Sequence, residues 1–439
     1  MHIPHIAQAY ERIKKTCDSK LNQIYPIQIP EPVNARYQLE LEYLKTSNYL
    51  DDFEIFRCLN IEAVKCSQVL SMRGTITSSY IIYLLGNSLL NPLPTHYYCP
   101  KCGHYETVDT KLFCIDLPEE KCPQCQTNLI ADGFNLPVEA VWGPDGKKTL
   151  SFDYNISEEF IPFAKRVLQN LYPHHVIAPL GLCNRPAEEK AIEMNHSGFL
   201  ILPEGRNMED YPEMTGFLED GELCLSGNIL DIENNCMHRV LLLQNKFIEQ
   251  IIAMQRKTGI YANEISLPEL HTLNWNDINN SLALTDAESY LFCTIKPKTF
   301  FDMVCLDAAS HNTYSNKDFS THDGNYYSLP TLFEKPEFKK YPCYTREDFF
   351  EELLKMGIKL EKAYEIAEFI RKGKQNSTMQ KFIDQFATFD IPKDIKSVAK
   401  EYLYLVPRSH SAECMLIYAK LAFYAKKDSR AYSKIVFKR

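Results

Sequence analysis

The sequence contains no long apolar run, no internal repeat and no low-complexity segment. Its apolar stretches all stop well short of the roughly 18 residues that a helix needs to cross a bilayer. A positively charged N-terminal region followed by an apolar run is also absent, so we expect no secretory signal. These absences predict a cytoplasmic protein without a membrane partner. The 15 cysteines are then expected to be mostly reduced, because disulfides are rare in that compartment.

The charge of the chain is unevenly distributed. The length of 439 residues allows a large core and roughly two to four domains, and the net charge of −9 argues against a generic nucleic-acid coat. Residues 201–233 hold nine acidic residues and one basic residue, whereas residues 401–439 hold eight basic and three acidic residues. A polyanion would be attracted to the C-terminal part and repelled by the middle of the chain. The alternative for the tail is a solvated face on helices.

Two Cys-x-x-Cys motifs stand close together in the chain. Cys99 and Cys102 form the first, and Cys122 and Cys125 follow after nineteen residues. This spacing is typical of a four-thiolate zinc site, which is closed to substrate and therefore structural. The alternatives are two disulfides or scattered buried thiols. A disulfide between residues three apart is usually strained, which counts against the first of them.

A turn rich in small and hydroxyl residues precedes the apolar run 81–85. Arg73 opens it, and Ser78 and Ser79 close it. Such a turn at the start of a helix can present N–H groups to phosphate, and Arg73 can neutralise the charge. The two serines are also common as simple N-caps, so both interpretations stay open.

Apolar periodicity predicts the other elements. Helices are expected over residues 1–24, 157–171, 235–257, 346–356, 360–372 and 412–425. Strands are expected over residues 138–154, 197–203 and 223–232, with mixed structure over 34–70. Residues 306–345 are polar and are expected to form loops. Asp153 and Ser151 are two residues apart on an expected strand, so their side chains should share one face.

These residues, taken in order, resemble bacterial replicative DNA polymerase of the PolC type. The likeness covers roughly residues 25–439 with deletions. It rests on the double cysteine motif and on ordered matches at residues 73–79, 91–97, 153–159, 195–203, 296–300, 370–374 and 407–412.

The resemblance implies an α+β fold. It consists of a nucleotidyltransferase-like mixed-sheet palm, an inserted zinc-knuckle module and a mostly helical, fingers-like region. The implied domains are an N-terminal helical region with the first palm segment (1–95), the four-cysteine module (96–135), the palm core (136–260) and the fingers-like region (261–439).

The resemblance implies that this chain keeps only part of the set of catalytic carboxylates found in the family. The family palm holds two Mg²⁺ ions with three aspartates, and two-metal phosphoryl transfer depends on them. The first aspartate falls at Ser151, the second is kept as Asp153, and the third maps best to Asn228. Asp231 or Glu233 substitutes for the third if the alignment is shifted by a few residues. Mg²⁺ is therefore expected only if activity survives.

Other family features are partly kept. The glycine of the phosphate turn falls at Thr77, and a basic palm residue falls near Ala178. The resemblance also leaves a set of expected DNA- or nucleotide-binding residues, whose alternative role is solvated charge: Arg73, Ser78, Ser79, His196, Arg371, Lys372, Lys374, Arg408 and His410. The exonuclease, OB, PHP and clamp-binding regions of the family have no counterpart in the sequence.

Two functional hypotheses follow. The first is a pseudoenzyme that has lost nucleotidyl transfer and binds primer–template DNA or replisome proteins. The second is a divergent Mg²⁺-dependent polymerase or nucleotidyltransferase that uses Asp153 with Asp231 or Glu233. A folded remnant without function or partner is a third interpretation.

Overall fold

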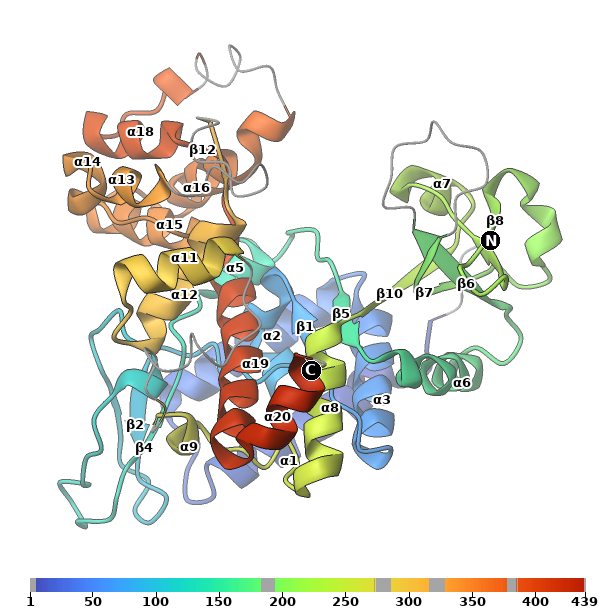
Figure 1. Ribbon diagram of the computed structural model, residues 1–439, viewed down its shortest axis with the longest axis horizontal. Coiled ribbons are helices and arrows are strands. Elements are labelled where there is room, and N and C mark those ends of the chain that lie inside the picture. Colours follow the sequence, from blue (N-terminus) through green and yellow to red (C-terminus); the bar gives the residue numbers. More distant parts are fainter. Residues whose placement is uncertain are drawn as a thin grey trace.

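A mixed seven-stranded sheet runs from the middle of the computed structural model to a lobe on the right of Figure 1. The structure describes residues 5–182, 194–271, 273, 286–315, 328–376, 384 and 386–437, and for 286, 287 and 372–376 the backbone only. The order of the strands is β1 (Ser71–Arg73), β5 (Asp153–Ile156), β10 (His238–Gln244), β7 (Asn195–Ile201), β6 (Ile177–Leu182), β9 (Leu223–Leu225) and β8 (Thr215–Phe217). Strand β5 runs antiparallel to β1 and parallel to β10.

Strand β7 approaches β10 very closely at Gly198. An added Cβ at Gly198 would lie 2.0 Å from the carbonyl oxygen of Val240, and the φ angle of this glycine is +125°. Only glycine tolerates that approach and that conformation. The pairing of Leu241 with Gly198, and thus the register of β10, depends on it.

N-terminal helices cover one part of the sheet. They are α1 (Ala9–Ile24), α2 (Glu31–Thr46), α3 (Leu50–Lys65) and α4 (Tyr80–Leu84), joined by α5 (Val138–Trp142) and α6 (Ile161–Leu171). Their apolar faces form one core with β1, β5 and β10, in which the rings of Phe53 and Trp142 stack 5.9 Å apart. The described part of this region is therefore a helical layer packed on the sheet.

The segment between α4 and α5 contains a second, small sheet of three strands. It contains β2 (His96–Tyr98), flanked by β3 (Tyr105–Thr107) and β4 (Ile130–Asp132). The short 3-10 helices are η1 (Thr75–Ser78), η2 (Cys114–Asp116), η3 (Glu158–Phe160), η4 (Met208–Asp210) and η5 (Pro212–Met214).

The C-terminal half is mostly helical. Its helices are α8 (Lys246–Thr258), α9 (Leu267–His271), α11 (Asp286–Ile295), α12 (Phe300–His311), α13 (Leu329–Phe333), α14 (Pro336–Lys340), α15 (Arg346–Lys355), α16 (Leu360–Asn376), α18 (Lys393–Lys400), α19 (Arg408–Lys427) and α20 (Ser429–Val436). A two-stranded ladder, β11 (Thr313–Tyr314) with β12 (Tyr402–Tyr404), joins them. Helix α19 packs against β1 and η1 and so connects this half to the central sheet.

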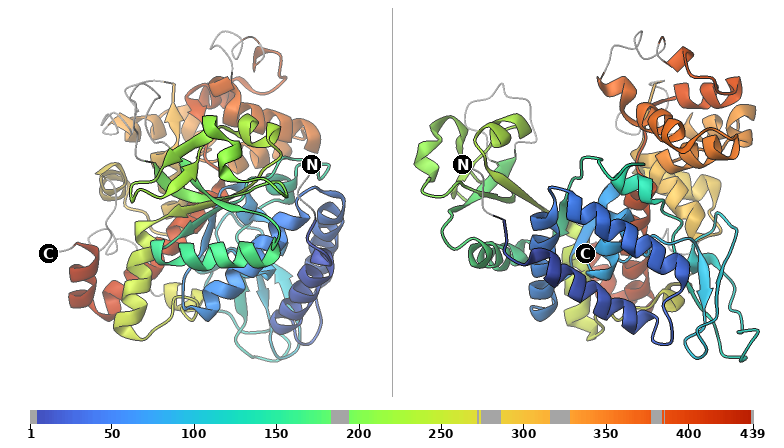
Figure 2. Two further views of the ribbon diagram at one scale, coloured as in Figure 1. Left: turned by 90° about the vertical axis from the view of Figure 1, so that its right-hand side faces the viewer. Right: turned by 180° about the vertical axis from the view of Figure 1, so that it is seen from behind.

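The end of the sheet that carries β6, β9 and β8 forms a separate lobe (Figures 1 and 2). It holds β8, β9 and α7 (Ile229–Asn234), and a small apolar cluster that includes Ala178, Leu200 and Leu225 supports it. We call residues 201–233 the acidic lobe. Among the described helices, none is both long and apolar enough to pass through a membrane.

Several expected elements differ in the structure. Residues 138–142 form helix α5, so the strand expected from residue 138 begins only at Asp153. The strand expected over 223–232 ends at Leu225 and is followed by α7, and residues 238–244 form β10 before α8 begins. The expected loop over 306–345 contains the end of α12 and the short helices α13 and α14, with residues 316–327 outside the described part.

Candidate functional site

A cavity of about 530 Å³ lies where the central sheet meets the C-terminal helices. It combines side chains from β1, β5, α12, α16, β12 and α19, elements that are far apart in the sequence. Its lining residues are Arg73, Gly74, Thr75, Lys148, Thr149, Ser151, Asp153, His311, Glu368, Arg371, Tyr404, Val406, Pro407 and His410. Five residues singled out from the sequence, Arg73, Ser151, Asp153, Arg371 and His410, therefore meet in one place.

Asp153 begins β5 at the wall of this cavity. Ser151 Oγ donates a hydrogen bond to Asp153 Oδ1 over 3.3 Å, as expected for two side chains on one face. Burial raises the pKa of the Asp153 carboxyl, while the positive charges of Arg73 and Arg239 and the Ser151 hydrogen bond act in the opposite direction. Arg73 is also the residue that pairs with Asp153 across the β1–β5 ladder. The carboxylate is thus accompanied by two arginines.

The residue directly beside Asp153 on the next strand is Leu241. It pairs with Asp153 in the parallel β10–β5 ladder. Asn228 instead lies at the N-cap of α7, where it accepts a hydrogen bond from Asp231 N–H, and Asp231 accepts one from Asn228 N–H in return. Strand β9, three residues before Asn228, is four strand positions from β5, or roughly 19 Å at the usual spacing. Asn228, Asp231 and Glu233 thus belong to the acidic lobe, and none of them lines the cavity.

The two serines of the hydroxyl-rich turn are buried. Ser79 Oγ accepts a hydrogen bond from Ile82 N–H and donates one to Glu40 Oε2, which makes Ser79 the N-cap of α4. Ser78 is fully buried, and its carbonyl oxygen accepts a hydrogen bond from Arg36. Thr77 is also buried, and its hydroxyl donates to Gly74 O. From this turn, only Arg73, Gly74 and Thr75 reach the cavity.

The basic groups of the cavity differ in how much charge they offer. Arg371 lines it and donates hydrogen bonds to Glu368. Burial, with the positive charges of Arg73 and His311, lowers the pKa of His410 to about 3, and its Nδ1 accepts a hydrogen bond from Gly74 N–H. Burial and nearby Arg346 lower the pKa of Lys148 to about 7 despite the opposing effect of Glu368. Arg73 and Arg371 are the arginines of the lining, and Arg371 is ion-paired with Glu368. The charge of Asp307 raises the pKa of His311, the other basic residue of the lining.

Arg408 does not reach this cavity. Its guanidinium is buried and donates hydrogen bonds to Asp348 and Glu351, while its backbone N–H donates to Glu347. These contacts hold α15 against the start of α19. Arg408 is thus buried in the core and does not line the cavity.

His196 lies on β7, outside the cavity lining, where burial lowers the pKa of its imidazole. The side chains of Lys372 and Lys374 lie outside the described part of the chain.

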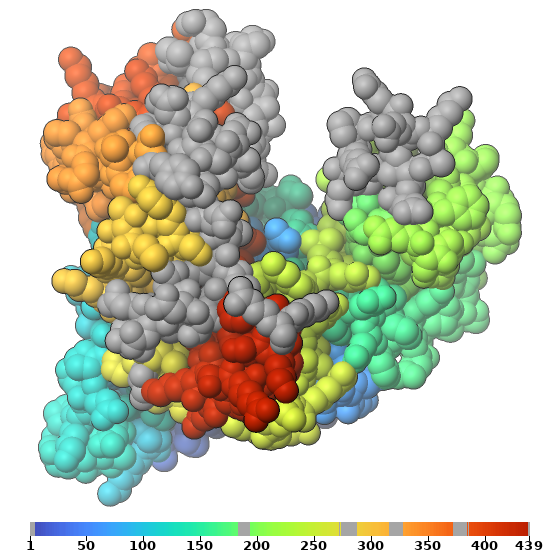
Figure 3. Space-filling view, viewed as in Figure 1, coloured from blue at the N-terminus to red at the C-terminus, as the bar shows by residue number. Residues whose placement is uncertain are grey.

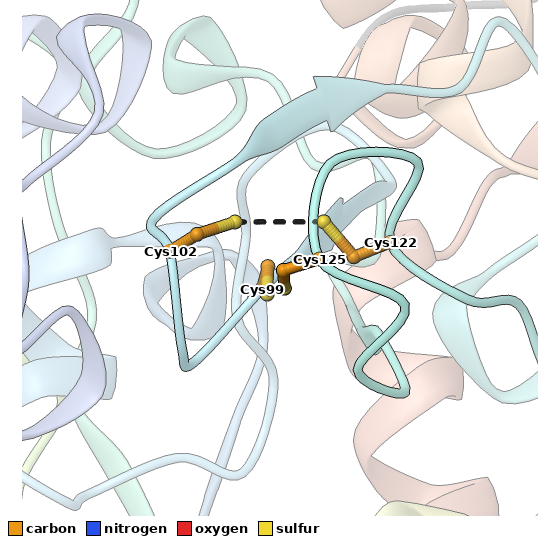
Figure 4. A group of neighbouring side chains, drawn as sticks. All are labelled: Cys99, Cys102, Cys122 and Cys125. Carbon is orange, nitrogen blue, oxygen red and sulfur yellow. Dashed lines mark hydrogen bonds between the residues drawn. The ribbon is translucent and has the colours of Figure 1, made fainter.

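The four cysteines of the paired motifs lie together (Figure 4). Cys99 Sγ is 3.4 Å from Cys125 Sγ, and Cys102 Sγ is 3.5 Å from Cys122 Sγ. These separations exceed the roughly 2.05 Å of a disulfide bond. They approach the roughly 3.8 Å expected for sulfurs placed tetrahedrally about 2.3 Å from Zn²⁺. All four ligand atoms lie within 4.8 Å of one another, so the set fits a structural zinc ion.

Several lining residues were not predicted from the sequence. Lys148 and Thr149 follow a turn, Glu368 lies within α16, and His311 ends α12. None belongs to a recognisable motif, and only the packing of α12, α16 and α19 brings them to β5. Leu241 carried no signal either, because an apolar residue in an apolar run is ordinary.

Comparison with known proteins gives a family and a set of relatives. The family model described as bacterial DNA polymerase III alpha NTPase domain matches residues 11–197. The PolC-type DNA polymerase III of Caldanaerobacter subterraneus subsp. tengcongensis is 23% identical over 96% of this chain and 33% of its own. The corresponding protein of Bacillus subtilis is 22% identical over 100% of this chain and 34% of its own. The chain spans about a third of the length of these relatives.

Proposed function

Because the chain is a distant homologue of PolC-type DNA polymerase III alpha, we propose that it binds primer–template DNA without catalysing nucleotidyl transfer. The cavity between the central sheet and the C-terminal helices is the proposed contact site for the DNA backbone. In this proposal the sheet corresponds to the polymerase palm, the C-terminal helices correspond to the fingers, and the four cysteines hold a structural zinc ion.

The observation that carries the proposal is the pairing of Asp153 with Leu241. Two-metal phosphoryl transfer needs carboxylates that face one another around ions about 3.5–4 Å apart. Ser151 is a neutral neighbour of Asp153, and Leu241 occupies the paired position on β10. At the paired positions of β5 and β10, Asp153 is the one carboxylate, and Glu368, the other acidic residue of the cavity lining, is bound by Arg346 and Arg371. One free carboxylate cannot balance two divalent cations, so the facing carboxylates that the reaction requires are missing.

The charges around Asp153 support binding of a polyanion instead. Arg73 and Arg239 both interact electrostatically with its carboxylate, which gives this group of three residues a net charge of about +1 at neutral pH. Arg371 adds a further guanidinium to the same cavity, where its charge is offset by its ion pair with Glu368. Guanidinium groups bind phosphate oxygens through charge-assisted hydrogen bonds, and the binding is sensitive to salt.

Primer extension and fluorescence anisotropy on one labelled primer–template test the proposal. We expect no extension with Mg²⁺ or Mn²⁺, and salt-sensitive binding that persists in EDTA. Arg73→Gln should weaken binding about 5- to 10-fold at low salt and reduce the salt slope by about one. Asp153→Asn should leave binding unchanged or tighter, because it removes a negative charge facing phosphate.

Arg256→Gln provides a matched control for Arg73→Gln. Arg256 is exposed, lies outside the cavity lining and is paired with Glu159, so its loss should barely affect binding. Extension that disappears in Asp153→Asn would overturn the proposal in favour of a divergent polymerase. Equal losses of binding in Arg73→Gln and Arg256→Gln would remove the cavity as the contact site.

A further inference from the structure

A second group of metal-ligating side chains lies next to the cavity. Glu288 on α11 and Asp307 and His311 on α12 offer ligand atoms that all lie within 4.8 Å of one another. Asp307 and His311 are four residues apart, which places them on one face of the helix. This set shares no residue with the four cysteines and does not include Asp153.

Asp307 is the most unusual member of the group. Its side chain is fully buried, and in the described structure neither carboxylate oxygen accepts a hydrogen bond of good geometry, although the nearby hydroxyl of Ser411 acts to lower the pKa of Asp307. The approach of His311 Nδ1 to Asp307 Oδ2 is 3.5 Å, too long for a good hydrogen bond. Burying a carboxylate without hydrogen bonds is costly unless a cation compensates its charge. His311 is the one group of the described structure that forms an ion pair with Asp307, and a bound cation at this position would contact both side chains.

The neighbouring ligands fit a cation at this position. Glu288 is 2% exposed, whereas the side chain of His311 is 43% exposed and lines the cavity. A cation bound here would thus have protein ligands on the buried side and an approach from the cavity. Two carboxylates and an imidazole are hard and borderline ligands, a combination that suits Mn²⁺ or Zn²⁺ and does not need thiolates.

We propose that Glu288, Asp307 and His311 bind one divalent transition-metal cation, Mn²⁺ or Zn²⁺, at the edge of the cavity. Ligand atoms around one such ion lie roughly 3–3.5 Å apart, so the group closes on the ion by small side-chain rotations. Three protein ligands leave coordination positions for water on the cavity side. The site shares no residue with the cysteine cluster.

Titration with Mn²⁺, followed by electron paramagnetic resonance, tests this site in the intact chain. Protein-bound Mn²⁺ loses the six-line signal of the free ion, so the signal counts bound ions directly. Thiolates prefer softer metals, so Mn²⁺ should leave the four-cysteine site unaffected. We expect one Mn²⁺ per chain, displaced by one equivalent of Zn²⁺ if Zn²⁺ is the preferred ion.

Three variants locate the ion. Asp307→Asn and His311→Ala should each weaken Mn²⁺ binding at least 10-fold, because each removes one of three ligands. Asp153→Asn is the matched control: it neutralises another carboxylate of the same cavity and should retain the bound ion. Because Asp307 is buried, circular dichroism must show that the Asp307→Asn protein is folded. If that variant is unfolded, His311→Ala, at the cavity surface, provides the test. Absence of binding in the unmodified protein, or equal binding in His311→Ala, would overturn the proposal.

Discussion

Glu413 shows how strongly a single buried carboxyl can be coupled to its surroundings. It lies on α19 and is 2% exposed, and it accepts hydrogen bonds from the hydroxyls of Ser71 and Ser88. Burial raises its pKa to about 7 from an ordinary value of 4.5, despite the opposing effects of the two serines and of Lys420. At neutral pH this residue therefore ionises in a site that favours its protonated form.

The stability of the protein should depend on pH through this residue. Because the pKa of Glu413 is higher in the folded chain, its favourable contribution is complete below pH 4.5 and is lost as the pH rises through about 7. Glu413→Gln mimics the protonated form and lacks this loss. As the pH rises from 4 to 8, the free energy of unfolding of the variant should therefore increase by roughly 3 kcal/mol relative to that of the parent protein. Urea unfolding at several pH values measures it. The exposed Glu42→Gln should show no such shift, and a constant difference for Glu413→Gln would contradict the assignment.

Among the elements, α15 and α19 are held together by one buried cation. Arg408 Nη2 donates to Asp348 Oδ1 at 2.7 Å and to Glu351 Oε2 at 2.9 Å, and Arg408 Nη1 donates to Asn135 O at 3.0 Å. The contact to Asn135 also joins these helices to the segment that follows β4. Removing the guanidinium would leave buried carboxylates without compensation.

Arg408→Ala should therefore destabilise the fold rather than reduce DNA affinity selectively. We expect a loss of about 3–5 kcal/mol in the free energy of unfolding, as for other broken buried ion pairs. Arg256→Ala removes an exposed arginine that is also paired with a carboxylate, and it should cost less than about 1 kcal/mol. Denaturant unfolding of both variants gives the comparison. Equal losses of stability in the two variants would contradict the contribution of the buried ion pairs. An Arg408→Ala protein of unchanged stability that no longer binds DNA would assign Arg408 to DNA binding instead.

Elements with a strong local signal were predictable from the sequence. Helices α15, α16 and α19 carry regular apolar stripes, and the four cysteines have their own spacing rule. Strand β10 was missed because its apolar run leads directly into the stripe of α8. The boundary was marked by Asn245, whose side chain accepts hydrogen bonds from Phe247 and Ile248 N–H at the helix start. The C-terminal half of α12 was expected to be a loop because polar residues such as Asp307, which are buried in the helix, resemble loop composition.

The site was predictable only in part, because long-range register is invisible in a single sequence. Arg73, Ser151 and Asp153 could be associated because they match ordered motifs of one family. Leu241 could not be placed beside Asp153 before the β5–β10 pairing was known. Asn228 matched a short motif locally, yet it lies in the acidic lobe. His311 and Glu368 reach the cavity through helix packing alone.

At the scale of the whole molecule, charge and shape are linked. The surface is hollowed between the C-terminal helices and the acidic lobe (Figure 3). One side of the hollow belongs to a segment with nine acidic residues and one basic residue, in a chain of net charge −9. The loop between β8 and β9 carries three exposed acids, Glu219, Asp220 and Glu222, which we call the loop acids. Their field should repel an approaching polyanion before any contact forms.

Neutralising the loop acids should therefore speed DNA association. Replacing all three by their amides changes the net charge from −9 to −6. We expect the association rate constant to rise several-fold at about 10 mM salt, because exposed charges act at long range. The gain should vanish near 0.5 M salt, where these charges are screened. The dissociation rate constant should change little. A control carries the same charge change on other exposed acids, as Glu11→Gln, Glu42→Gln and Glu249→Gln. Stopped-flow anisotropy measures both rates. An equal gain in the control would assign the effect to net charge alone, and slower association after neutralisation would mean that the lobe attracts the ligand.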